Sequence, residues 1–366
     1  MSVDIGIIGL PKSGRTTVFN TLTTSKAHMG SYTPEAPHIG IARVTDPRLD
    51  KLVELLNPKK RIPVEIRYID IGASVKSMTK DITISGEYLS QLSNTNALMN
   101  VTRAFTEESV PHTEGSVNVE RDIIAMELEL AYSDLNIIER RLNKIDISLK
   151  SARQEGRQQF HHEQSILVKI KSRLEKDIPI REQGLTVDEK RLIFGYQFLS
   201  AKPLLTLINI GEEQISEIKL IEKKFNQRFS KPEHKFIALC SKLEMELGQL
   251  DAATAGEYRK EFGLIESGLE RTIKTSLDLM GLITFFTTAS DEVKAWSIPH
   301  GNEAIKAAGK IHTDMERGFI RAEVISFNDL VKAGSITEGR KHGLLRLEGK
   351  HYIVQDGDII NFLFNV

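Results

Sequence analysis

The sequence predicts an α/β protein in which a sheet domain of the P-loop (G-domain-like) type carries a helical coiled-coil insertion and a C-terminal β-grasp domain. Three observations predict this architecture. A glycine-bracketed loop joins a strand-like run to a helix-like run near the start of the chain. Apolar residues recur at helical spacing beyond residue 120. Short alternating runs surround one helical segment between residues 318 and 366.

The balance of charges excludes a global basic field. The chain has 49 basic and 50 acidic residues, so any nucleic-acid contact must be a local patch. The single cysteine, Cys240, rules out an internal disulfide framework and ends an apolar run, which favours a buried thiol in a reducing compartment. No apolar run approaches membrane-spanning length, and a strand-like run starts almost at the N-terminus. These features predict a soluble cytoplasmic protein without a membrane contact.

The phosphate-binding template G-x-x-x-x-G-K-[ST] is nearly matched near the N-terminus. Its glycines let backbone N–H groups point at a phosphate, and the following helix adds the positive end of its dipole. The predicted phosphate-binding residues are Gly9, Lys12, Ser13, Gly14, Arg15, Thr16 and Thr17. Arg15 stands in place of the template lysine and has a bulky, planar guanidinium group that keeps the positive charge. We therefore expect phosphate binding to survive and efficient hydrolysis to be in question. The alternative is a structural glycine turn without a ligand, which the strand–loop–helix context disfavours.

Three residues are candidates for holding a magnesium ion. Thr16 offers its hydroxyl from the loop, and Thr33 lies in the segment that would be the first switch of a P-loop protein. Asp70 stands near the end of the strand predicted over 64–71, where a carboxylate can orient a metal-bound water. The glycine that normally senses a γ-phosphate is displaced here, since Gly72 comes one place early and Ala73 follows it. A turn or capping role is the alternative for Asp70.

The segments between these motifs complete an alternating pattern of strands and helices. The predicted elements are a strand over 39–44, a helix over 49–56 capped by Asp46, a helix over 86–92, a strand over 96–101, a helix from Thr186 to about Ser200, and strands over 203–209 and 235–240.

A helical hairpin is predicted after residue 119. Apolar residues at helical spacing indicate one long helix to about residue 149 and a second one up to residue 174, separated by the polar segment 151–162. The hairpin carries many basic residues: Arg140, Arg141, Lys144, Lys150, Arg153, Arg157, Lys169, Lys171 and Arg173. Because acidic residues are interleaved, a solvated coiled-coil surface is one interpretation, and a ribosome or RNA contact is the sharper one.

A candidate base-recognition site follows two buried strands. Asn209 ends the first of them and is followed by Ile210 and Glu212, and Ser241 comes directly after the second. An aspartate in place of Glu212 would pair with both N–H groups on one edge of guanine, so the longer glutamate loosens the match to guanine. A turn role is the alternative for Asn209.

The C-terminal part predicts a small separate module. The run 277–288 indicates a strand or a helix end, and Trp296 lies in a polar setting before a linker at 299–301. Strands are predicted over 321–326, 344–347, 352–354 and 359–364, with one helix over 327–333 and turns at Gly349-Lys350 and Asp356-Gly357. This pattern is typical of a ubiquitin-like β-grasp module.

Taken in order, these motifs resemble the Obg-like ATPase family, also called YchF. The segments that carry the resemblance are Gly9–Asn20, Thr45–Leu52, Tyr68–Ser77, Asn100–Phe105, Ala201–Glu213, Ala307–Val324 and Tyr352–Val366. The resemblance implies a P-loop NTPase domain over 1–118 and 186–300, a coiled-coil insertion over 119–185 and a TGS domain over 301–366. It also implies association with ribosomes and use of Mg²⁺ with ATP or GTP. ATP is preferred in that family because its base motif is Asn-x-x-Glu, which Asn209 and Glu212 match.

Three departures from the family pattern concern the phosphate-sensing elements. Arg15 stands where the family has lysine. Asp70-Ile71-Gly72-Ala73-Ser74 stands where the family has Asp-x-Ala-Gly-Leu. The first switch lacks the family's Pro-Phe-Cys-Thr-Ile run. Two interpretations therefore stay open. The first is a ribosome-associated protein that binds ATP or GTP and hydrolyses it slowly. The second is a non-catalytic ribosome- or protein-binding adaptor with a relic P-loop, in which the hairpin and the TGS domain do the binding.

Overall fold

The computed structural model describes residues 3–23, 37–71, 91–151, 154–288 and 291–365. The chain divides into two compact units. The larger unit contains residues 3–41 and 67–269, and the smaller unit contains residues 42–66 and 270–366. Each unit is built around its own sheet of six strands.

The first sheet has the strand order β2-β4-β1-β5-β6-β7. Its strands are β1 (Val3–Ile8), β2 (His38–Arg43), β4 (Glu65–Asp70), β5 (Ala97–Arg103), β6 (Leu204–Asn209) and β7 (His234–Leu239). The four strands β1, β5, β6 and β7 run parallel to their neighbours. Their residues are almost all buried, as expected for a parallel sheet covered on both faces. Strands β5, β6 and β7 agree within two residues with the predicted ranges 96–101, 203–209 and 235–240.

Helices of the larger unit are α1 (Arg15–Leu22), α4 (Val119–Ser151), α5 (Gln154–Leu174), α6 (Val187–Ile193), α7 (Ile218–Phe229), α8 (Ser241–Leu247) and α9 (Ala252–Glu261), and α10 (Gly268–Leu279) leads out of it. The N-terminal part of α4 packs on the sheet, where Met126 and Leu130 join one core cluster with Ile8, Leu98 and Leu204. Helices α7 and α8 contribute to a second cluster that contains Ile208 and Phe236. The parallel strands are thereby enclosed in apolar side chains.

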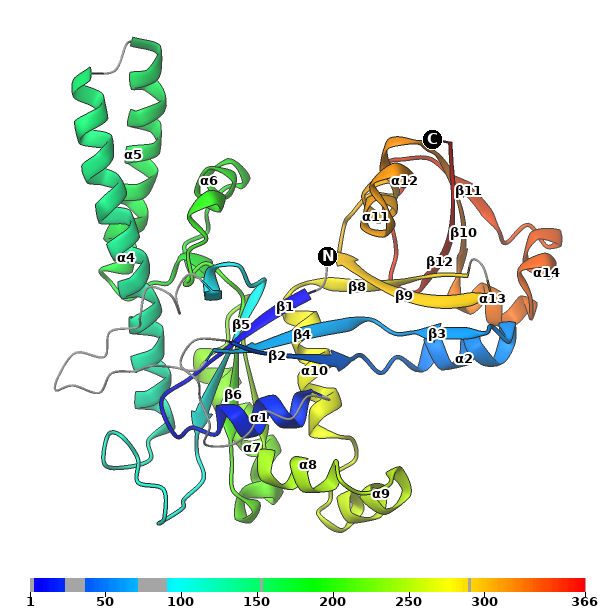
Figure 1. Ribbon diagram of the computed structural model, residues 1–366, viewed down its shortest axis with the longest axis horizontal. Helices are drawn as coiled ribbons and strands as arrows, with labels where there is room; N and C mark the ends of the chain where they lie inside the picture. The colour runs from blue at the N-terminus through cyan, green and yellow to red at the C-terminus, as the bar shows by residue number, and fades with distance from the viewer. Residues whose placement is uncertain (1–2, 24–36, 72–90, 152–153, 289–290, 366) are drawn as a thin grey trace. The chain divides into compact units, whose positions relative to one another are not determined.

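The predicted helical hairpin is present as α4 and α5, which extend side by side away from the sheet (Figure 1). Buried residues of both helices, among them Ile138, Ile145, Leu167 and Ile170, form a shared core. The expectation that residues 151–162 interrupt the hairpin is wrong for most of that range, because α5 already begins at Gln154. Glutamine, glutamate and arginine are good helix formers, and Phe160 packs against the shared core, so the helix extends through this polar run.

Helix α6 begins as predicted and ends early. Thr186 accepts a hydrogen bond from the backbone N–H of Glu189, and the Glu189 carboxylate accepts one from the Thr186 N–H. The helix ends at Ile193, short of the predicted end near Ser200, and a tight turn leads to Gln197 in the left-handed region with φ 53°. This turn brings Phe198 into the hairpin core.

The second sheet has the strand order β11-β10-β12-β8-β9-β3. Its strands are β3 (Lys60–Ile62), β8 (Leu282–Thr287), β9 (Glu292–Pro299), β10 (Phe319–Ser326), β11 (Arg346–Glu348) and β12 (Asp358–Phe364). The helices of this unit are α2 (Pro47–Leu56), α11 (Ala304–Ile311), α12 (Thr313–Arg317), α13 (Phe327–Ala333) and α14 (Ile336–Lys341). Strands β10 and β12 and helix α13 confirm the pattern that predicted a β-grasp module.

Two predictions for the C-terminal part are wrong. Trp296 is not next to a linker in a polar setting. It lies within β9, where it pairs across the sheet with Phe285 and stacks on that ring at 6.5 Å between centroids. The strand predicted over 352–354 forms only a single bridge, between Ile353 and Glu303. The predicted domain boundary at residue 301 falls between β9 and α11, both of which belong to the smaller unit.

Within the described ranges, no helix is long and apolar enough to cross a membrane.

Candidate functional site

The glycine-bracketed loop follows β1 and turns directly into α1. Gly9 and Gly14 have φ angles of 147° and 93°, which side-chain-bearing residues rarely adopt. There is also no room for side chains, since a Cβ on Gly9 would lie 2.4 Å from the Val101 carbonyl oxygen and one on Gly14 would lie 2.2 Å from Asn209 Nδ2. The loop and the N-terminus of α1 together form the arrangement that binds anions through backbone N–H groups.

Two polar atoms of this loop are buried without a hydrogen-bond partner among the described residues. They are Ser13 Oγ and Arg15 Nη1. A buried guanidinium nitrogen without an acceptor is costly, and a phosphate oxygen is the acceptor that best matches a guanidinium. Lys12 is exposed and has a left-handed φ of 64°. The loop therefore has donors in place for an anion.

The magnesium candidates Thr16 and Asp70 lie together. Thr16 Oγ1 donates a hydrogen bond to Asp70 Oδ2 at 3.4 Å, although 54 residues separate them. The Asp70 side chain is fully buried at the end of β4. A hydroxyl and a carboxylate at this spacing are hard oxygen ligands of the kind that Mg²⁺ takes. Thr33, Gly72 and Ala73 lie outside the described residues.

Asn209 joins the loop to the predicted base site. Its Nδ2 donates to the Ser13 carbonyl at 3.0 Å, and its Oδ1 accepts from Ser241 Oγ at 2.7 Å. Parallel pairing of β6 with β7 places Asn209 opposite Leu239, so the ends of the two strands lie side by side. Asn209 and Ser241 are both almost fully buried. Predicted residues that are far apart in sequence are thus connected by one amide.

The remaining base-site candidates differ in how accessible they are. The Ile210 side chain is buried in the apolar core, so it is not available to contact a base. Glu212 is exposed and forms an ion pair with Lys242 at 3.1 Å, and this contact raises the pKa of Lys242. A purine that reaches Glu212 would have to compete with the Lys242 ammonium.

Two residues that were not predicted from the sequence, Arg103 and Phe105, also shape the site. Arg103, at the end of β5, donates to the carbonyl oxygens of Phe105, Glu107 and Val110 and so holds the loop after β5 in place. The Phe105 ring stacks on the Arg103 guanidinium at 4.5 Å and lies 3.8 Å from the position that a Cβ on Gly14 would take. The sequence signal that could have identified them is Arg103 at the end of a predicted buried strand, two residues before the aromatic Phe105.

Comparison with known proteins identifies relatives over the full length of the chain. The family model YchF-GTPase_C, described as "Protein of unknown function (DUF933)", matches residues 282–365. The Bacillus subtilis protein named ribosome-binding ATPase YchF is 36% identical over 370 residues, and the alignment covers 100% of both chains. The Escherichia coli protein of the same name is 35% identical over 369 residues, again with 100% of both chains covered.

Two solved structures are also similar. The Schizosaccharomyces pombe YchF GTPase superposes with a TM-score of 0.84 at 29% identity, covering 99% of this chain and 98% of that one. A GTP-binding protein from Pyrococcus horikoshii gives a TM-score of 0.62 at 16% identity, which supports the fold alone. With the fold, the loop and the full-length relatives in agreement, the chain belongs to the YchF family of P-loop NTPase-fold proteins.

Proposed function

We propose that this chain is a ribosome-associated protein that binds a purine nucleotide, ATP or GTP, at the loop between β1 and α1. The observation that carries the proposal is the pair of buried polar atoms, Ser13 Oγ and Arg15 Nη1, that lack a partner within the described part of the chain. The Bacillus subtilis and Escherichia coli relatives are named ribosome-binding ATPases, which supports the same function.

The loop residues fit a nucleotide triphosphate with magnesium. Gly9, Lys12, Ser13, Gly14, Arg15, Thr16 and Thr17 would hold the phosphates through backbone N–H groups and side chains. Thr16 and Asp70 would hold Mg²⁺, which would supply positive charge that neutralises the phosphates. The 3.4 Å contact between these two side chains shows that they reach the same place.

Slow hydrolysis follows from Arg15. The lysine of the template touches the β- and γ-phosphates as a compact point charge, whereas a guanidinium is planar and wider. Arg15 can neutralise phosphate charge and anchor the ligand, and it offers a poorer match to the transferring group. We therefore propose nucleotide binding with low turnover.

The base site supports ATP over GTP. Asn209 is fixed by Ser13 and Ser241, and Glu212 is paired with Lys242. The longer Glu212 and its ion pair both weaken the two-point contact that guanine would need. The hairpin over 119–185 and the C-terminal β-grasp module over 301–366 are the proposed ribosome-binding parts.

The test is binding of fluorescent ATP and GTP to the purified full-length chain with Mg²⁺, in parallel with phosphate release. We expect micromolar binding of ATP and slow release. Gly14→Ala should abolish binding because its methyl group would meet Asn209, whereas Gly156→Ala, whose methyl group meets open space, is the control. If neither nucleotide binds the unmodified chain, the loop is a relic and the adaptor interpretation replaces this one.

A further inference from the structure

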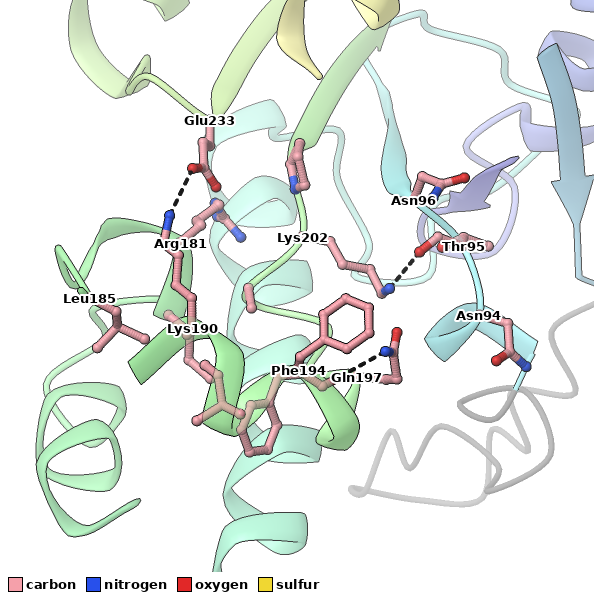
Figure 2. Close-up of a pocket in the computed structure, with 15 residues that line it drawn as sticks. Asn94, Thr95, Asn96, Arg181, Leu185, Lys190, Phe194, Gln197, Lys202 and Glu233 are labelled. Atoms are coloured by element: carbon pink, nitrogen blue, oxygen red, sulfur yellow. Dashed lines mark hydrogen bonds and ion pairs between the residues drawn. The ribbon is translucent and has the colours of Figure 1, made fainter. Parts of the chain in front are cut away.

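A cavity of about 540 Å³ lies in the larger unit, away from the glycine-bracketed loop (Figure 2). Its lining includes Asn96, Pro203 and Glu233, which precede β5, β6 and β7 in the chain. Because these strands are parallel, their amino ends meet at one edge of the sheet and the loop lies at the opposite edge. The cavity is therefore a separate site.

One wall of the cavity is apolar and partly aromatic. It is formed by Ile180, Leu185, Ile193, Phe194, Phe198 and Pro203. The Phe194 ring is 74% exposed, which is unusual for an aromatic side chain and places it at the rim. A volume of several hundred Å³ with such a wall is typical of small-molecule sites.

The charged groups of the cavity are mainly cationic. Lys190, Arg181 and Lys202 line it together with a single carboxylate, that of Glu233. Lys190 and Glu233 pair at 3.7 Å across the rim, and their side chains are 60% and 36% exposed. So long and exposed an ion pair opens easily when another anion arrives.

Lys202 supplies a buried donor to the cavity. Only 8% of this residue is exposed, and its ammonium donates to the carbonyl oxygens of Ser93 at 2.9 Å and Thr95 at 2.5 Å. These bonds use two of the three N–H groups of the ammonium, which leaves the third available. Burial lowers the pKa of Lys202 to about 8, against the attraction of Asp134, so the charge is only partly compensated by the protein.

Arg181 adds a second incompletely satisfied cation. Its side chain is 1% exposed and pairs with Glu127 at 2.6 Å, while its Nε is buried without a partner among the described residues. Two cations that are more than nine-tenths buried thus retain donors next to an apolar wall. Natural structures seldom leave such donors unsatisfied unless a ligand or water completes them.

We propose that this cavity binds a small organic anion with a planar aromatic body, at a site independent of the nucleotide. The aromatic body would lie against Phe194 and Phe198, and the anionic group would meet Lys202 and Lys190. The site lies beside α6 and the base of the hairpin, since Arg181 and Phe198 contact α4 and the hairpin core respectively. Its ligand would therefore stabilise the junction of the hairpin with the sheet.

The probe for the test is 1-anilinonaphthalene-8-sulfonate, titrated into the full-length chain and followed by fluorescence and calorimetry. N-phenyl-1-naphthylamine, which lacks the sulfonate, is the matched neutral probe. We expect one site for the sulfonate, with about tenfold or more weaker binding of the neutral probe. Equal affinity of the two probes would overturn the assignment of an anion.

Substitutions at two exposed positions of the cavity test where the probe binds without disturbing the core. Lys190→Glu and Phe194→Ala should each weaken sulfonate binding by about tenfold. The control variants are Lys219→Glu and Phe262→Ala, which change similar exposed side chains elsewhere and should leave it unchanged. Unaltered binding in both cavity variants would overturn the proposal, as would displacement of the probe by excess ATP with Mg²⁺. If the unmodified chain binds the sulfonate probe and binds neither ATP nor GTP, the proposed function is contradicted and the assignment of this site is supported.

Discussion

Arg15 is the residue that most directly sets the chemistry of the loop. We expect Arg15→Lys to raise the rate of phosphate release from ATP on the order of tenfold, because a compact ammonium can follow the γ-phosphate where a guanidinium cannot. The measurement is phosphate release at saturating ATP and Mg²⁺. Arg191→Lys, an exposed exchange on α6, is the control. A variant rate that stays at zero would argue that the loop does not turn over at all.

Asn209 is the residue that holds the loop and the base site in one geometry. Asn209→Ala removes the bonds to the Ser13 carbonyl and the Ser241 hydroxyl and leaves both groups buried. We expect a loss of about 1–3 kcal/mol in the free energy of unfolding, measured by urea denaturation, together with weaker nucleotide binding.

Ser241→Ala is the matched comparison for Asn209. It removes one of these bonds and keeps the contact of Asn209 with Ser13, so it should cost less stability than Asn209→Ala. Equal losses in the two variants would show that the contact with the loop contributes nothing.

At the scale of elements, a buried carboxylate of helix α4 holds the segment that leads into β6. Asp134 accepts hydrogen bonds from the backbone N–H groups of Leu199 and Ser200 at 2.9 and 2.8 Å. Desolvation raises the pKa of Asp134 to about 6, above its ordinary value of 3.8. The folded chain therefore holds this proton more tightly than the unfolded chain, so the carboxyl group favours folding more at low pH.

The expected result is a pH-dependent difference between the wild-type chain and Asp134→Asn. As the pH rises from about 4 to about 6, the wild-type chain should lose about 2 kcal/mol of unfolding free energy relative to the variant. Urea denaturation at several pH values measures this difference. A difference that is flat across that range would show that Asp134 does not retain its proton on folding.

Elements with a strong local signal were predicted well from the sequence. Periodicities and caps are created by residues that are close in sequence. They mark the buried strands, the start of α6 and the two long helices of the hairpin. Strand β9 was missed because its partners are β8 and β3, and β3 lies more than 200 residues earlier. The extent of α5 was missed because its residues 154–159 have no apolar side chain and therefore give no helical periodicity.

In the candidate site, too, some residues could be predicted from local motifs and others are brought together only by the fold. Gly9, Gly14, Thr16 and Asp70 follow from motif spacing, and the structure places Thr16 next to Asp70. The clamp formed by Asn209 and the packing of Phe105 on Arg103 depend on strands that meet only in the folded sheet. The cavity lined by Lys190 and Lys202 gives no local signal, because its residues come from four separated segments.

At the scale of the whole molecule, the smaller unit is completed by residues 42–66. Leu49, Leu52 and Val64 share a core with Phe286 and Ile325, and Arg48 donates to Asp356 at 2.7 Å. The family model covers 282–365 and leaves residues 42–66 out. The stability of the C-terminal module therefore depends on a distant part of the chain.

Leu52→Ala tests this dependence in the full-length chain. Leu52 is fully buried, so its truncation should destabilise the smaller unit by about 2–5 kcal/mol. Hydrogen exchange followed by mass spectrometry should show reduced protection in β8, β9 and β12. Glu54→Ala on the exposed side of α2 is the control, and unchanged exchange in the Leu52 variant would mean that these strands are stable without α2.

The placement of residues 42–66 also bears on the order in which the protein can fold during its own synthesis. These residues leave the translating ribosome before the 300 residues from 67 to 366, which include all their partners in the second sheet. At ordinary elongation rates that interval is on the order of 15–60 s. Until Phe286, Val293 and Ala295 have emerged, Leu49 and Leu52 lack the residues of the second sheet that they pack against. A nascent chain of this kind is exposed to aggregation early and gains its last native contacts only when its final strand, β12, has emerged.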